Sequence, residues 1–93
     1  MLAGCDYGSM SANFDEKDPK KLVINTRYKK VEPTESEMVK DLSEIIDILS
    51  RYPTRMPKRI QIFFQKDLPD TVKATALLEF GRKFFATIIW QPE

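Results

Sequence analysis

One stretch, residues 34–52, constrains the fold of this chain more than any other. It opens with Thr34-Glu35-Ser36-Glu37, in which a threonine precedes a glutamate at the spacing of a helix capping box. Apolar residues then recur at helical spacing, and they form a stripe of Met38, Val39, Leu42, Ile45, Ile46 and Leu49. Tyr52-Pro53 ends the pattern, because a residue before proline is disfavoured in the α conformation. The stretch predicts one amphipathic helix.

Four other stretches have the alternating side chains of β-strands. Residues 20–30 and 59–65 alternate apolar with polar or charged residues. Residues 71–80 and 84–91 alternate as well, and the short connection between them predicts a C-terminal antiparallel hairpin. The predicted fold class is α+β with the order β-α-β-β-β. It is a two-layer sandwich, in which one helix packs on a four-stranded mixed sheet ending in the hairpin.

The chain divides into a leader and one domain. Its 93 residues are enough for a single modest core. Residues 1–19 show neither helical nor strand periodicity and end at Pro19, so we expect a flexible leader or tether there and a single α+β domain over residues 20–93. The alternative is that the leader folds back onto the domain through Tyr7 or Phe14.

The composition argues against several kinds of chemistry. The chain has one cysteine and no histidine, so it lacks the usual zinc ligands and the usual general base. The closely spaced carboxylates lie in a predicted turn or at a predicted helix start, where acidic residues are common for structural reasons, so they do not indicate a catalytic pair. We therefore predict a protein that is not an enzyme and that has no cofactor and no metal site.

The predicted architecture leaves one face of the sheet uncovered. A single helix shields only one side of a four-stranded sheet, and the alternation places Phe63, Leu77, Phe85 and Ile89 on the other. Apolar side chains gathered in this way are typical of a binding surface. We expect these four residues to contact a protein partner or a second copy of the chain. The leader folded over them is the structural alternative.

Charge is unevenly distributed along the chain. The net charge is +1, but residues 1–19 and 34–52 are each −3, which leaves +7 on the remaining residues. Lysines at strand ends commonly protect sheets from aggregation. A cytoplasmic module that binds nucleic acid through this basic surface is the alternative function, and it predicts affinity that falls steeply with added salt.

The N-terminal run Leu2-Ala3-Gly4-Cys5 resembles the lipobox of bacterial lipoproteins and contains the only cysteine. In that family the cysteine receives a lipid, and a signal peptide with charged and apolar segments precedes it. Only Met1 precedes Leu2 here, so the resemblance implies a signal peptide encoded upstream; an accidental match is the alternative. The resemblance implies lipidation of Cys5 and a membrane-anchored accessory protein of the cell envelope. Asp6 resembles the signal for retention in the inner membrane of Gram-negative bacteria.

Overall fold

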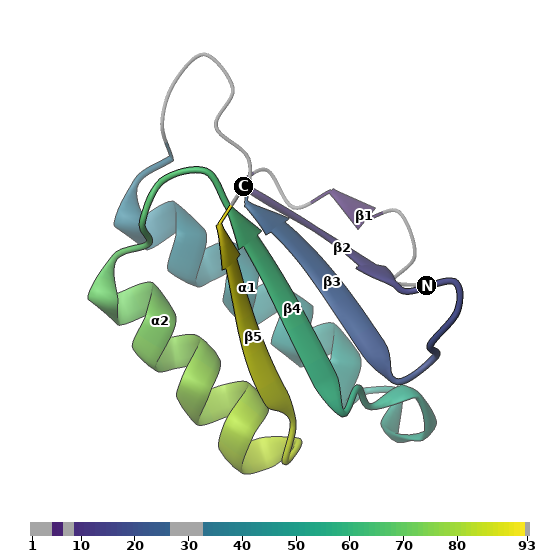
Figure 1. Ribbon diagram of the computed structural model, residues 1–93. Coiled ribbons are helices and arrows are strands. Elements are labelled where there is room, and N and C mark those ends of the chain that lie inside the picture. The colour runs from purple at the N-terminus through teal and green to yellow at the C-terminus, as the bar shows by residue number, and fades with distance from the viewer. Residues whose placement is uncertain (1–4, 7–8, 27–32, 93) are drawn as a thin grey trace.

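Figure 1 shows a computed structural model of the chain, in which residues 5–6, 9–26 and 33–92 are described. The strands, in chain order, are β1 (Cys5–Asp6), β2 (Met10–Phe14), β3 (Lys21–Thr26), β4 (Arg59–Phe64) and β5 (Thr87–Pro92). The helical elements are α1 (Glu35–Ser50), a 3₁₀ turn η1 (Pro53–Arg55), α2 (Asp70–Ala76) and a π-helical segment η2 (Leu77–Lys83). The predicted α+β class is confirmed.

The strands are arranged in the sheet in the order β1-β2-β3-β4-β5. The pairs β1–β2 and β2–β3 are antiparallel, whereas β3–β4 and β4–β5 are parallel, so the sheet is mixed as predicted. Each parallel pair is joined by a crossover through a helix. Both crossovers step in the same direction, and both helices lie on one face of the sheet, so the two crossovers have the same handedness (Figure 1).

The predicted helix is α1, and its cap has the expected geometry. The backbone N–H of Glu37 donates to the hydroxyl of Thr34 at 3.2 Å, and the backbone N–H of Thr34 donates to the Glu37 carboxylate at 3.3 Å. These bonds satisfy two backbone donors that the helix itself cannot satisfy. The side chains that α1 buries are Met38, Leu42, Ile45, Ile46 and Leu49. The prediction from the sequence was therefore correct for both the capping box and the buried apolar stripe of this helix.

The core lies between the sheet and the two helices. Alternate strand residues face the helices, and this layer contains Met10, Ala12, Leu22, Ile24, Ile60 and Ile62, all buried. Phe80 and Phe84 from the second helical region fill the space near β5, with ring centroids 5.8 Å apart. One continuous cluster thus joins all the long elements, because each helix presents one apolar stripe to one face of the sheet.

The predicted C-terminal hairpin is wrong. Residues 70–83 are helical, and β5 runs parallel to β4 rather than antiparallel to a preceding strand. The buried residues of this segment are Val72, Ala76 and Phe80, which are four apart. A spacing of four fits a strand face, whose period is two, and also a helix face, whose period is 3.6. The fold therefore has a second helix where the sequence indicated a strand, and the single-helix prediction is corrected with it.

The predicted leader is also corrected in part. Residues Met10–Phe14 form β2, which pairs with β3 along its whole length, and Met10 and Ala12 are buried in the core. Ser9 is tied to the helix layer, because its backbone N–H and its hydroxyl both donate to the Asp41 carboxylate of α1, at 2.9 and 2.5 Å. The alternative, a leader folded back on the domain, describes residues 9–14 better. Tyr7 lies outside the described residues.

Candidate interaction surface

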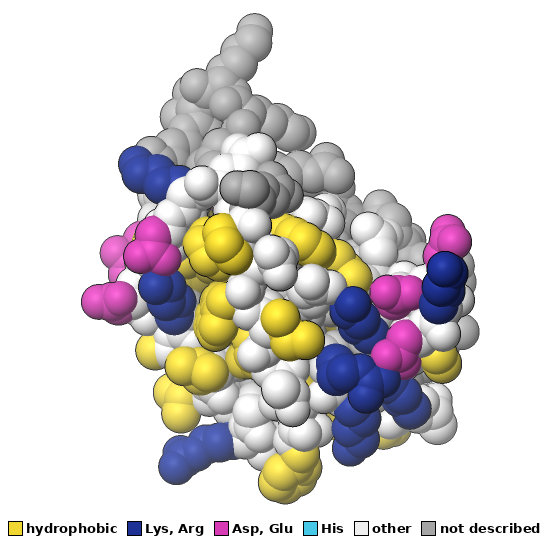
Figure 2. Space-filling model, in the orientation of Figure 1, with side chains coloured by type: hydrophobic (Ala, Val, Ile, Leu, Met, Phe, Trp, Pro, Cys, Tyr) yellow, Lys and Arg dark blue, Asp and Glu magenta, His cyan; other side chains and the backbone are white. Residues whose placement is uncertain are grey.

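The sheet face opposite the helices carries a mixture of apolar and amide side chains. It includes Val23 and Asn25 of β3, Gln61 and Phe63 of β4, and Ile89 and Gln91 of β5. We call these six residues the open face. Figure 2 shows it from the front: hydrophobic side chains gather toward the β5 and α2 side, and charged side chains gather at the lower side near the starts of β3 and β4. The middle of the open face is uncharged.

Two of the four predicted contact residues lie on the open face. Phe63 is opposite Gln91, and Ile89 is opposite Gln61, so the two apolar side chains are diagonal neighbours on adjacent strands. Phe63 is half-buried and Ile89 is exposed. Because residues 71–80 are helical, Leu77 lies on η2 and not on the sheet. The prediction that all four share one sheet face is therefore wrong for Leu77 and Phe85.

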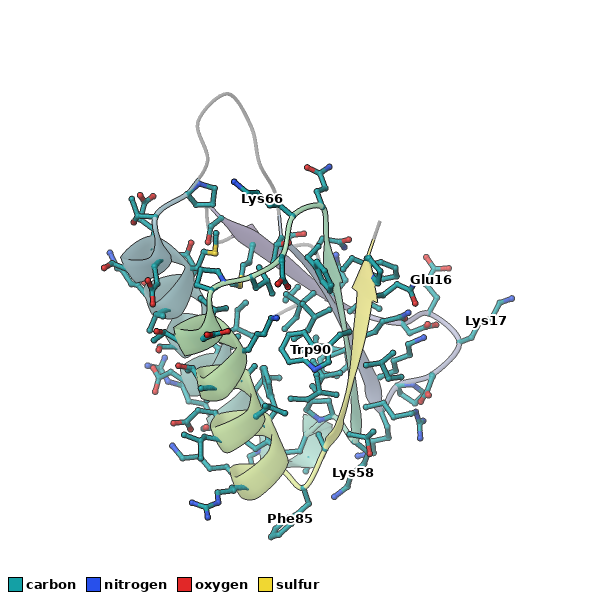
Figure 3. The ribbon with its side chains drawn as sticks, turned by 60° about the vertical axis from the view of Figure 1, so that its left-hand side comes forward. Glu16, Lys17, Lys58, Lys66, Phe85 and Trp90 are labelled. Atoms are coloured by element: carbon teal, nitrogen blue, oxygen red, sulfur yellow. The ribbon has the colours of Figure 1, made fainter. Side chains whose placement is uncertain are left out.

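Phe85 projects from the turn between η2 and β5. Its φ of 55° lies in the left-handed region, and its side chain is 80% exposed. This conformation costs a non-glycine residue about 1–2 kcal/mol. It lets the backbone N–H of Ala86 reach back to the carbonyl of Phe80 at 3.0 Å, which closes the end of the helix. The result is an aromatic ring that points away from the body of the molecule (Figure 3).

Most of the other exposed large apolar side chains belong to the same segment of the chain as Phe85. Among the described residues, the exposed large hydrophobic side chains are Leu77, Leu78, Phe85 and Ile89, together with Tyr52 in the connection after α1. The first four all belong to the segment from η2 through β5. The sequence pattern did not reveal this grouping, because it depends on residues 77 and 78 being helical.

A small cavity lies between α2 and the ends of β4 and β5. It has a volume of about 290 Å³ and is lined by Phe64, Lys73 and Trp90. Trp90 extends from β5 toward the helix layer (Figure 3). The ammonium group of Lys73 lies 2.8 Å from the Asp67 carboxylate. Their hydrogen bond raises the pKa of Lys73 and lowers the pKa of Asp67 from their usual values.

Ion pairs neutralise part of the basic surface. Arg59 donates to Asp18, and this hydrogen bond is the main reason why the pKa of Asp18 lies below its usual value. Lys83 pairs with Glu79 at 2.7 Å. A cation that already has a carboxylate partner attracts a phosphate less strongly than a free one. Lys29 and Lys30 lie outside the described residues, and nucleic-acid binding stays a prediction.

The predicted lipidation residue begins the sheet. Cys5 is the first residue of β1 and is paired in register with Ala12 of β2. Across the described ranges, no group of three or more histidine, cysteine or acidic residues is placed to hold a metal ion. In the same ranges no helix has the length and hydrophobicity to span a bilayer.

Comparison of the chain with protein-family models, with curated protein sequences and with solved structures gave no match.

Proposed function

We propose that this chain is a non-enzymatic protein-interaction module of the bacterial cell envelope, and that it contacts its partner through the open face. The observation that carries the proposal is the position of Phe63 and Ile89 on adjacent strands, on the side of the sheet away from both helices. A rigid sheet holds such side chains at fixed spacing, so this chain loses little conformational entropy when a partner binds them.

The chemistry of the open face defines the partner. Its apolar side chains alternate with the amides of Asn25, Gln61 and Gln91, which donate and accept hydrogen bonds without carrying charge. Protein–protein interfaces commonly combine apolar and polar groups and contain few charged residues in their buried part. The complementary surface is therefore a protein patch with its own apolar residue and with backbone or amide groups around it.

The resemblance of Leu2-Ala3-Gly4-Cys5 to a lipobox supports a location at the membrane. Because β1 begins at Cys5, a lipid on this residue would hold the β1 edge of the sheet directly at the bilayer. Two acyl chains anchor a protein stably, since each buried CH₂ contributes about 0.8 kcal/mol. β5 forms the opposite edge of the sheet and would point away from the membrane.

Site-specific photo-crosslinking in cells tests the contact. We expect a photoreactive amino acid in place of Ile89 to give one adduct with a different protein, which its mass distinguishes from two crosslinked copies of this chain, and the same group in place of the exposed Tyr52 to give none. The adduct with the different protein should disappear when Phe63→Ser is added, provided that circular dichroism shows an unchanged fold. Equal labelling of that protein from both positions, or an adduct with it that survives Phe63→Ser, would refute the contact through the open face.

Metabolic labelling tests the anchor. The gene is expressed from its own locus in cells fed an alkyne analogue of palmitate. We expect the wild-type protein to be labelled and to partition into detergent, and the Cys5→Ser variant to be unlabelled and aqueous. An unlabelled wild-type protein would rule out lipidation while leaving the protein contact open to the crosslinking test.

A further inference from the structure

β5 is an edge strand whose outer side has no strand beside it. The backbone N–H of Thr87 donates to the carbonyl of Lys58 at 2.9 Å, so Thr87 points its backbone groups toward β4. Backbone groups alternate in direction along a strand, and those of Ile88 and Trp90 therefore point away from the sheet. No residue in the described ranges pairs with them.

This edge lacks the features that usually prevent strands from pairing. β5 has six residues and none is charged, whereas natural edge strands are commonly short or carry lysines. At the other edge of the sheet, β1 comprises two of the described residues. Pro92 has no N–H and sits at an outward position, so it would end a ladder there without interrupting the ladder at Ile88 and Trp90.

We infer that two copies of this chain pair through β5, antiparallel, around a two-fold axis at Ile89. In this register Ile88 of each copy lies opposite Trp90 of the second copy, and each such pair exchanges both of its backbone hydrogen bonds. Ile89 faces Ile89 of the second copy in the more closely spaced type of pair. Ile–Ile and Ile–Trp neighbours are favourable cross-strand contacts, and the two sheets become one.

The helix layer fits the same axis. A two-fold axis perpendicular to the sheet keeps both helix layers on one side, with the two copies of α2 and η2 antiparallel. Leu77 and Leu78 are exposed and lie at the middle of the helical run from Asp70 to Lys83, so they would meet their own counterparts near the axis. Seen from the β5 side, α2 lies in the layer beside β5 and leaves the strand uncovered (Figure 3).

The charges along this helical run are complementary under the same symmetry. Asp70 is exposed at its beginning and Arg82 is exposed near its end. Antiparallel packing brings Asp70 of each copy toward Arg82 of the second copy, which gives two attractive contacts. Lys73 and Lys83 have carboxylate partners within their own copy and add little net charge. The residues of this helical run that lie nearest the two-fold axis, Leu77 and Leu78, carry no charge that would repel its counterpart.

The expected area indicates a weak dimer. A six-residue strand is about 20 Å long, and the two layers are together about 20 Å deep, so the contact face measures about 400 Å² on each copy. The total, about 800 Å² for the two copies, is below the standard size of specific protein–protein interfaces and fits a weak, transient contact. We therefore expect dimers that form at micromolar to near-millimolar concentration and dissociate on dilution. The dimer uses the backbone edge of β5, and of the six open-face residues only Ile89 and Gln91 lie on that strand.

Charge substitutions at Thr87 and Gln91 test the pairing. Both side chains are exposed, and in the proposed register Thr87 of one copy lies opposite Gln91 of the other. T87K/Q91K puts lysines opposite each other, whereas the matched control T87K/Q91E creates two attractive pairs at the same positions. By sedimentation velocity over a concentration series, we expect dimerisation to be weaker in the first variant than in the second by on the order of tenfold. A monomeric wild-type chain throughout, or equal behaviour of the two variants, would overturn the proposal.

Disulfide trapping tests the register. In a Cys5→Ser background, Ile89→Cys places two thiols on directly opposed residues, at a separation that a disulfide spans. We expect this variant to form a covalent dimer under mild oxidation. Gln91→Cys in the same background should remain unlinked, because residue 91 faces residue 87 of the second copy. Linkage at residue 91 but not at residue 89 would show a different register, and linkage at neither would show that β5 binds an extended segment of another protein or nothing; each result contradicts the inference.

Discussion

The two crossovers of the fold, β3-α1-β4 and β4-α2-β5, each join parallel strands through a helix. They differ in how the helix begins and ends and in how much of its apolar surface is buried. α1 begins with a capping box, and its apolar stripe is buried. α2 has no side-chain cap, passes into a π-helical segment and ends at the left-handed Phe85. Leu77 and Leu78 remain about half exposed, at 53% and 51%.

The two crossovers therefore differ in how completely they satisfy backbone groups and bury apolar side chains. Every distinctive feature of the first crossover satisfies a backbone group or buries an apolar side chain. The second crossover keeps a strained residue, an irregular helix and exposed apolar side chains, which are the features that cluster at functional sites. The edge strand that we infer to pair belongs to this second crossover.

The largest effect is expected from removing a core side chain of α1. Ile45 is fully buried, so Ile45→Ala should lower the free energy of unfolding by about 2–5 kcal/mol. Leu78→Ala, in the second crossover, should change it by only about 0.5 kcal/mol in the monomer, because the side chain is already half in water. Urea denaturation at low protein concentration compares the two. Similar losses would mean that the crossovers are not specialised in this way.

Removing the cap of α1 should have an intermediate effect. Thr34→Ala deletes the acceptor for the backbone N–H of Glu37 and should cost about 1 kcal/mol. Thr71→Ala is the matched control, because Thr71 is exposed in the first turn of α2, which has no side-chain cap. Denaturation curves of both variants should show a loss at residue 34 only. A comparable loss at residue 71 would contradict the contrast between the helix starts.

Relieving the strain at Phe85 should have a small effect of the opposite sign. Glycine adopts a φ of 55° freely but is more flexible in the unfolded chain, so Phe85→Gly should raise the free energy of unfolding by no more than about 1 kcal/mol. Phe84→Gly should instead be strongly destabilising, since Phe84 is buried against Phe80. A clear loss of stability in Phe85→Gly would show that the exposed ring packs on its own chain.

The smallest effect concerns the pH dependence of the Asp67–Lys73 pair in the second crossover. The pKa of Asp67 is lowered, so its stabilisation is present above the usual value of 3.8 and is lost as the pH falls through the lowered pKa. The pKa of Lys73 is raised, so its stabilisation is present below 10.5 and is lost as the pH rises through the raised pKa. Thermal unfolding of Asp67→Asn should therefore show a shallower loss of stability in both windows. An unchanged profile would mean that the pair contributes nothing.

The first crossover was predictable because its signals are local and agree with one another. The capping box, the stripe of α1, and the alternation of Leu22, Ile24, Ile60 and Ile62 each indicate one secondary structure. The second crossover was missed because Val72, Ala76 and Phe80 satisfy two periods at once. The short connection at residues 81–83 was predicted to be a hairpin turn, whereas the helical segment continues to Lys83 and the left-handed residue is Phe85. Half of the predicted contact set, Leu77 and Phe85, was misplaced for that reason.

The sequence by itself determined the α+β class, the capped helix, the alternation of three strands and the absence of charge on β5. Each of these features depends on residues that are close together in the sequence, through hydrogen bonds within a turn or through side chains that alternate along a strand. The tertiary structure decided that residues 10–14 join the sheet, that residues 70–83 are helical, and that β5 becomes an unprotected edge. Those outcomes depend on which elements pack together, because an apolar pattern that fits two conformations takes the one whose buried face finds a partner.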